Sequence, residues 1–138
     1  MNVYRVRKIV RGQAAGPALI CPGSFSFLGD VDLGNGRIIA AGNPNRGQAL
    51  RGAVLIYRET KGSSGGVVVL QTLVRKGLAP AAIVTVKPVD YNLAEGAILA
   101  QIPFACEPDG DILNEIRNGE PVRLDADAGL LEIVGGHS

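Results

Sequence analysis

The sequence predicts an α/β fold with a β-rich, barrel-like core and one or two main helices. Three observations lead to this prediction. Short apolar segments separated by turn residues recur along the chain, and only residues 67–76 combine helical spacing with good helix-end signals. Glycine, at 19 of 138 residues, is about twice as frequent as on average, which indicates many special backbone positions. Short strands joined by tight turns are typical of barrels rather than of an open doubly wound sheet.

The first part of the chain is predicted to form a series of short strands. Residues 3–10 alternate apolar and basic side chains, which is typical of a strand with one face in water. Gly12, Gly16 and Pro17 predict a break after this strand. Asn35-Gly36 predicts a tight turn, because both residues tolerate a positive φ. The further strands expected here are residues 18–20, 24–28, 37–41 and 50–57.

Residues 67–76 are predicted to form a helix. Val67, Leu70 and Val74 lie at i, i+3 and i+7, although the run of three valines favours a strand by propensity. Serines before the segment are good helix caps, and basic residues followed by Gly77 are typical of a helix end. Residues 81–86 are expected to form the next strand. Such a strand–helix–strand unit normally holds two parallel strands joined by a right-handed crossover.

The remainder of the chain is predicted to add short helical segments and a terminal hairpin. The expected elements are a helical turn at residues 91–95, a strand at 97–102, a helix at 112–117, and a hairpin of strands 121–125 and 130–134. Asp127-Ala128-Gly129 supplies the turn of this hairpin. The carboxylates around Gly110 and at the hairpin turn are expected to be solvated.

Composition and charge exclude several classes of protein. The 14 Lys and Arg residues against 13 Asp and Glu give a net charge of +1, which provides no electrostatic basis for binding nucleic acid or an anionic membrane. The chain starts without the apolar region of a secretory signal, and no stretch approaches the ~20 apolar residues of a membrane helix. We therefore expect one cytoplasmic domain that spans residues 1–138.

Potential metal ligands are scarce. The chain has one histidine, His137, and two cysteines, Cys21 and Cys106, whose separation matches no metal or redox motif. Two reduced, partly buried thiols are the expected state of these cysteines. A Cys/His metal site formed by this chain alone is therefore not expected, because such sites need more ligands.

Asp30-x-Asp32 resembles the start of a calcium loop, but the motif fails further along. An EF-hand needs an oxygen ligand at its fifth position, glycine at its sixth and glutamate at its twelfth, whereas this chain has Gly34, Asn35 and Ala41. Two turn carboxylates are one interpretation. The alternative is that Asp30 positions a substrate or a partner.

Gly62-Ser63-Ser64-Gly65-Gly66 precedes the predicted helix and has the composition of an anion-binding corner. Glycines allow successive backbone N–H groups to converge on one point, and the start of the helix adds a positive dipole end. The segment is not a P-loop, because Lys61 precedes the glycines instead of following them. The alternative interpretation is that the serines only cap the helix.

Several of these motifs, in this order, resemble the small subunit of the aconitase X family, from about residue 5 to residue 134. The segments that carry the resemblance are Gly12-Gln13-Ala14-Ala15-Gly16-Pro17-Ala18-Leu19, Phe25-Ser26-Phe27-Leu28-Gly29-Asp30-Val31-Asp32, Gly36-Arg37-Ile38, Lys61-Gly62-Ser63-Ser64-Gly65, Ala79-Pro80-Ala81-Ala82-Ile83 and Glu95-Gly96-Ala97-Ile98. The resemblance implies a swivelling β/β/α domain. It also implies a large partner subunit that holds an iron–sulfur cluster on its own cysteines.

The resemblance further implies roles for individual residues. Ser63 corresponds to the serine that acts as general base in the superfamily, and Ser64 is expected to contact the substrate. The remaining substrate contacts are expected at Gly62, Gly65, Gly66, Lys61, Ser26 and Asp30. Ordinary aconitases have a carboxylate-binding arginine at the position of Gly65, so this chain must bind its small anionic substrate in another way.

Two substrates are known in the family. One branch removes water from (R)-5-phosphomevalonate to give trans-anhydromevalonate 5-phosphate, and another dehydrates cis-3-hydroxy-L-proline. Bacterial hydroxyproline enzymes often have Phe-Trp-Gly-Gly where this chain has Phe27-Leu28-Gly29-Asp30, which favours phosphomevalonate. A non-catalytic domain that binds an anion or covers a partner is the alternative from another functional class.

Overall fold

The structure is a computed structural model that describes residues 2–61, 66–89 and 91–134. Its main sheet has the strand order β1-β10-β9-β3-β6-β7-β8-β2, and β4 and β5 form a small hairpin beside it. The strands are β1 (Val3–Arg5), β2 (Arg7–Val10), β3 (Gln13–Phe25), β4 (Val31–Asp32), β5 (Arg37–Ile38), β6 (Val54–Thr60), β7 (Ala82–Thr85), β8 (Phe104–Cys106), β9 (Pro121–Asp125) and β10 (Leu130–Ile133). The helices are α1 (Phe27–Asp30), α2 (Gly66–Arg75), α3 (Tyr91–Ala100) and α4 (Ile112–Glu115).

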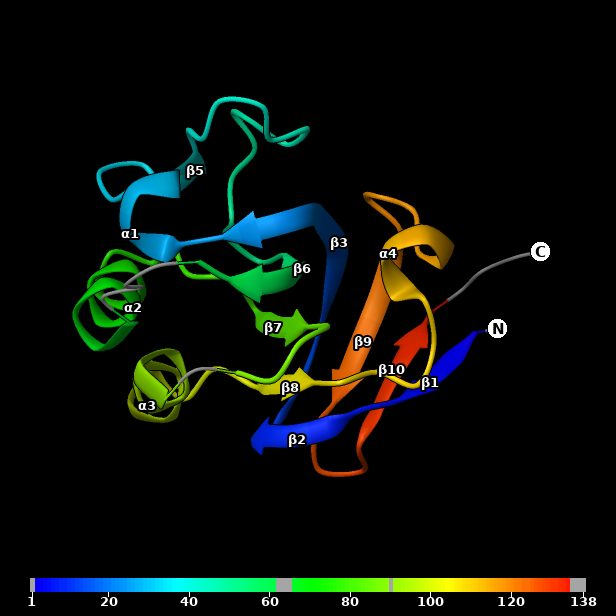
Figure 1. Ribbon diagram of the computed structural model, residues 1–138. Helices are drawn as coiled ribbons and strands as arrows, with labels where there is room; N and C mark the ends of the chain where they lie inside the picture. The colour runs from blue at the N-terminus through cyan, green and yellow to red at the C-terminus, as the bar shows by residue number, and fades with distance from the viewer. Residues whose placement is uncertain (1, 62–65, 90, 135–138) are drawn as a thin grey trace.

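The long strand β3 belongs to both halves of the sheet (Figure 1). Its first part pairs antiparallel with β9, and its second part pairs parallel with β6. The same division occurs at the start of the chain, where β1 pairs with β10 and β2 pairs with β8, with only Val6 between them. Because the two halves are joined at both sides, the sheet closes into the barrel-like core that the sequence predicts.

The predicted break at Gly16 and Pro17 is wrong, because β3 continues through both residues. Pro17 is opposite Pro121 at the point where the pairing of β3 with β9 ends and its pairing with β6 begins. No backbone hydrogen bond between strands therefore requires the N–H that proline lacks. Gly16 is required for a different reason. A Cβ atom at this position would lie 2.2 Å from the carbonyl oxygen of Gly52, so only glycine allows the turn before β6 to pack against β3.

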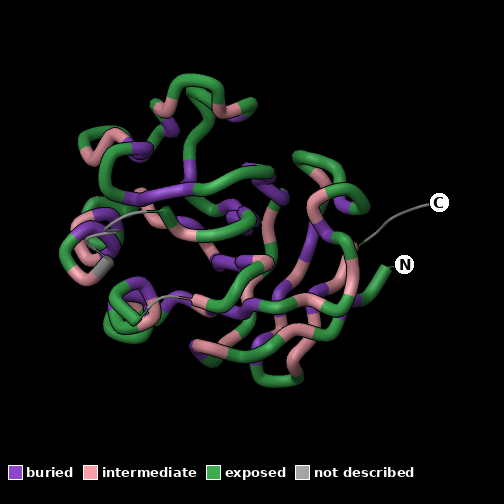
Figure 2. Tube along the Cα trace, in the orientation of Figure 1, coloured by how far each residue is buried: buried purple, intermediate pink, exposed green. Residues whose placement is uncertain are grey.

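The parallel strands separate two layers of buried side chains. On one face Leu19, Leu55 and Ile83 pack against α2 and α3. On the other face the neighbouring residues of the same strands, including Ile56 and Val84, pack against β9, β10 and α4. Figure 2 shows the buried positions concentrated along the strands and on the inner sides of the two longer helices. This is a β/β/α arrangement of layers.

Most of the remaining predicted elements are present. The predicted helix at residues 67–76 is α2, and β6 and β7, which flank it, are parallel neighbours. The short helix α4 and the hairpin of β9 and β10 also agree with the prediction. The strand predicted at residues 97–102 is wrong, because residues up to Ala100 continue α3. Leu93, Gly96 and Ala97 are buried at i, i+3 and i+4, a spacing that the apolar run concealed.

Candidate functional site

Asp30 lies where the chain turns after the end of β3, and its side chain is almost completely buried. One carboxylate oxygen, Oδ2, accepts the backbone N–H of Ser26 at 2.9 Å and lies 3.2 Å from Nζ of Lys61. Asp30 is 8% exposed and Ser26 is 5% exposed, so this is a buried polar cluster next to a lysine. Buried carboxylates are normally paired in this way, because an unpaired buried charge is costly.

The local sequence explains why the carboxylate points inward. Phe25 and Phe27 are fully buried, and their rings pack edge to face at a centroid distance of 5.3 Å. Gly29 has φ of +108°, a conformation that a residue with a side chain rarely adopts, so the chain can reverse within α1. The N–H of Asp30 then donates to the carbonyl of Ser26 at 3.1 Å. Two aromatic anchors and one glycine therefore fix the position of Asp30.

Lys61 approaches Asp30 from the neighbouring strand. It directly follows β6, and its backbone N–H donates to the carbonyl of Phe25 at 3.0 Å. Its side chain is 51% exposed, so the ammonium group contacts the buried carboxylate on one side and is open to solvent on the other. Because β3 and β6 are parallel, both residues lie at the carboxyl ends of these strands, where ligands commonly bind in α/β sheets.

A pocket of about 180 Å³ opens beside this ion pair. Cys21 and Ser24 of β3, together with Asp30 and Lys61, contribute to its lining, and the loop of residues 40–44 completes it. Small residues predominate in this loop, Ala40-Ala41-Gly42. The pocket therefore offers a cation and a hydroxyl group to a small polar molecule.

The loop that lines the pocket is held in place by two asparagines, Asn45 and Asn118, which no sequence motif marks. Asn45, which is 5% exposed, donates through Nδ2 to the carbonyl of Ile20 at 2.6 Å and to Oδ1 of Asn118 at 3.0 Å. The same Oδ1 accepts the N–H of Ile20 at 2.8 Å. At Ile20, β3 no longer pairs with β9 and has only β6 as a neighbouring strand. The side chains of Asn45 and Asn118 therefore form the hydrogen bonds that a second strand would otherwise make to the backbone of Ile20.

The structure brings three of the predicted site residues together: Lys61, Asp30 and Ser26. Gly62, Ser63, Ser64 and Gly65 lie outside the described residues, so their predicted roles stay predictions. Gly66 is the first residue of α2. In the sequence, residues 62–65 therefore lie between Lys61, which follows β6, and the first residue of α2, a helix of ten residues.

The two cysteines do not fit a metal cluster. Along the register Cys21 is opposite Tyr57, Tyr57 is opposite Thr85, and Thr85 is opposite Cys106. Three strand spacings separate the thiols by about 14 Å, too far for one cluster. Burial also raises the pKa of each thiol, which favours the protonated form that does not bind metal. No group of three potential metal-ligating side chains occurs within the part of the chain that the structure describes.

We predict that Asp30→Ala destabilises the protein more than Asp30→Asn. Asparagine keeps an oxygen that accepts the Ser26 N–H and loses only the charge beside half-exposed Lys61, at a cost of about 0–1 kcal/mol. Alanine removes the acceptor as well, and the expected loss is about 1–3 kcal/mol. Urea denaturation of the two variants measures the difference. Equal losses would show that the carboxylate does not stabilise the turn through Ser26.

The comparisons with known proteins define the class to which this fold and site belong. The family model of the aconitase X swivel domain matches residues 3–133. The chain therefore belongs to the aconitase X swivel-domain family. Among the helices of the described ranges, none is long and apolar enough to cross a membrane.

The similar proteins match over nearly their whole length. The phosphomevalonate dehydratase small subunit of Methanocella arvoryzae is 37% identical over 126 residues, which is 91% of this chain and 95% of that protein. The phosphomevalonate dehydratase small subunit of Methanothermobacter thermautotrophicus is 39% identical over 125 residues, with the same coverage. The crystal structure of Thermococcus kodakaraensis aconitase X in its holo-form has a TM-score of 0.87 at 35% identity, covering 96% of this chain and 98% of that one.

Proposed function

We propose that this chain is the small subunit of a two-subunit hydro-lyase that dehydrates (R)-5-phosphomevalonate to trans-anhydromevalonate 5-phosphate. Ser63 is the general base of the reaction. A large aconitase X subunit completes the site and holds the iron–sulfur cluster. The observation that carries the proposal is the ion pair of buried Asp30 with half-exposed Lys61 at the carboxyl ends of the parallel strands, two residues before Ser63 in the sequence, in a chain similar throughout to dehydratase small subunits.

The proposed chemistry explains why a lysine and a helix start belong next to Ser63. Dehydration removes a proton from one carbon of the substrate and a hydroxyl group from the next. A free serine hydroxyl is a weak base, and it accepts a carbon-bound proton effectively only where nearby groups stabilise the alkoxide. The ammonium of Lys61 and the N–H groups at the start of α2 supply such stabilisation. Asp30 keeps Lys61 at this edge of the sheet.

The substrate assignment depends on the relatives and on one sequence segment. The two relatives described above are named for phosphomevalonate. Phe27-Leu28-Gly29-Asp30 also lacks the second glycine that hydroxyproline enzymes often have at its last position. In this chain that position is occupied by Asp30, whose buried carboxylate pairs with Lys61. A chain with glycine there would have no such pair.

The scarcity of metal ligands in this chain supports the assignment of the cluster to the other subunit. Cys21 and Cys106 are buried and three strands apart. We therefore assign the cluster to the large subunit, and this chain contributes the base and part of the substrate pocket.

The test is anaerobic co-purification of the two subunits followed by an assay of dehydration. We expect turnover of (R)-5-phosphomevalonate and none of cis-3-hydroxy-L-proline. Turnover of hydroxyproline alone would refute the substrate assignment. A fully active complex that tolerates Ser63→Ala would instead identify this chain as a non-catalytic domain.

A further inference from the structure

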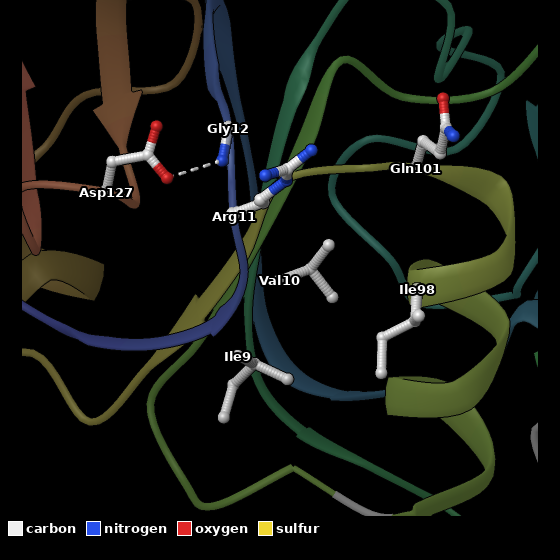
Figure 3. Close-up of a pocket in the computed structure, with 7 residues that line it drawn as sticks. All are labelled: Ile9, Val10, Arg11, Gly12, Ile98, Gln101 and Asp127. Atoms are coloured by element: carbon white, nitrogen blue, oxygen red, sulfur yellow. Dashed lines mark hydrogen bonds between the residues drawn. The ribbon is translucent and has the colours of Figure 1, made fainter.

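A second pocket, of about 640 Å³, is lined by the residues drawn in Figure 3 and lies at the opposite edge of the sheet from Lys61. Val10 at the end of β2 pairs with Phe104, the first residue of β8, so the pocket is at the amino ends of the parallel strands. The end of α3 and the turn between β9 and β10 complete it. Its volume lies within the range of about 300–1,000 Å³ that is typical of small-molecule sites.

The lining of this pocket is divided into an apolar part and a polar part. Ile9, Val10 and Ile98 supply branched aliphatic side chains, and Ile98 is 55% exposed although it is apolar. Arg11 and Gln101 supply the polar groups, and in Figure 3 the guanidinium group of Arg11 extends toward the side where Gln101 lies. A ligand that fits both parts has an apolar chain and a polar head.

The charge of the polar part favours an anionic head. Arg11 has no hydrogen-bonding or ionic partner among the residues that the structure describes, so its donors are available. Asp127, the one carboxylate in the lining, extends toward Gly12 and accepts its N–H through Oδ1 at 3.1 Å, whereas the guanidinium group of Arg11 extends to the other side of the strand, away from Asp127 (Figure 3). A guanidinium group binds carboxylates and phosphates through paired hydrogen bonds, which makes such a head the natural partner.

Gln101 gives independent support, because it occupies a position where glycine is more stable. It has φ of +58° and ends α3, with its own N–H donating to the carbonyl of Ile98 and the next N–H, of Ile102, donating to Ala97. This is the arrangement in which glycine is strongly preferred, because a side chain is strained in the left-handed conformation. Strained residues of this kind cluster at ligand sites. The carboxamide of Gln101 at the rim of the pocket is consistent with such a use.

We propose that this pocket is a second ligand site, which binds a small soluble amphipathic anion with a short apolar chain and a phosphate or carboxylate head. Arg11 and Gln101 bind the head, and Ile9, Val10 and Ile98 contact the chain. The site is separate from the Asp30–Lys61 ion pair, and it does not depend on the dehydratase activity.

The test is a titration of the full-length chain with n-hexyl phosphate, followed by amide resonances in ¹H–¹⁵N spectra. We expect saturable shifts at Ile9, Ile98 and Gln101, and none with inorganic phosphate or 1-hexanol alone. Arg11→Gln should weaken binding by at least about tenfold, because it removes the paired charge-assisted hydrogen bonds to the head. Arg51→Gln makes the same charge change at an exposed turn and should leave the affinity unchanged.

Gln101→Gly separates binding from stability. It should raise the melting temperature, because the strain is relieved, and should nevertheless weaken the binding of hexyl phosphate. Undiminished affinity in either this variant or Arg11→Gln would overturn the proposal, as would equal shifts with 1-hexanol. Finally, the chain could sediment with phosphatidylglycerol vesicles, and Arg11→Gln could abolish this sedimentation. That result would identify the surface as a lipid-binding one and would also overturn the proposal.

Discussion

Replacing Ser63 by alanine is expected to lower kcat of the assembled two-subunit enzyme by about 10²- to 10⁴-fold, the contribution of a positioned general base. Alanine removes the hydroxyl oxygen that would accept the proton and leaves the neighbouring residues Gly62 and Ser64 unchanged. The measurement is steady-state dehydration of phosphomevalonate by the complex, with subunit association checked by gel filtration. A loss well below tenfold would remove Ser63 from the mechanism.

Ser64→Ala is the matched control, since it deletes the same atom one residue later. If Ser64 contacts the substrate equally in the ground state and the transition state, its loss raises KM and changes kcat little. The two variants therefore differ in which kinetic constant changes. An equal fall of kcat in both would show that the segment, rather than one hydroxyl, carries the effect.

Gly16→Ala is expected to destabilise the fold by about 1–3 kcal/mol, the usual cost of overpacking. The new Cβ atom would lie 2.2 Å from the backbone oxygen of Gly52, which no side-chain rotation can relieve. The strand must therefore move away from the turn before β6, at the point where β3 changes partners. Chemical denaturation of the chain, read by circular dichroism, measures the loss.

Gly23→Ala provides the control for Gly16 in the same strand. A Cβ atom at Gly23 would meet nothing within 4 Å. Its effect should be between neutral and a stabilisation of up to about 1 kcal/mol, since alanine restricts the unfolded chain. Similar losses at both positions would show that strand propensity, and not the contact with Gly52, decides the cost.

The sequence predicted elements whose signals are local. α2 was predictable because the apolar spacing and the basic end of the segment agree over ten residues. The terminal hairpin was predictable from its alternation and its Asp-Ala-Gly turn. The end of α3 was misread as a strand because the apolar run of residues 97–102 conceals its period. Pro17 was misread as a break, since proline is tolerated only through the change of partner that tertiary structure provides.

The candidate site was predictable one residue at a time but not as a cluster. Lys61 and Asp30 were both expected at the site on the basis of resemblance, yet nothing in their separation along the chain predicts that they pair at 3.2 Å. The asparagines that close the edge of β3 had no signal, because their partner is the backbone of Ile20. Side chains that bind distant backbone leave no pattern in the sequence around them.

The shared strand β3 also sets an order in which the molecule can be completed during its synthesis. The first part of β3 and all of β1 pair only with β9 and β10, which are translated after all the other strands described here. The second part of β3, together with β6, α2 and β7, has its partners much earlier in the chain. Pairing between such distant segments is slow because a long loop must close first. The edge of the sheet that carries Lys61 and Asp30 can thus form during translation. The barrel closes only after the hairpin of β9 and β10 has left the ribosome.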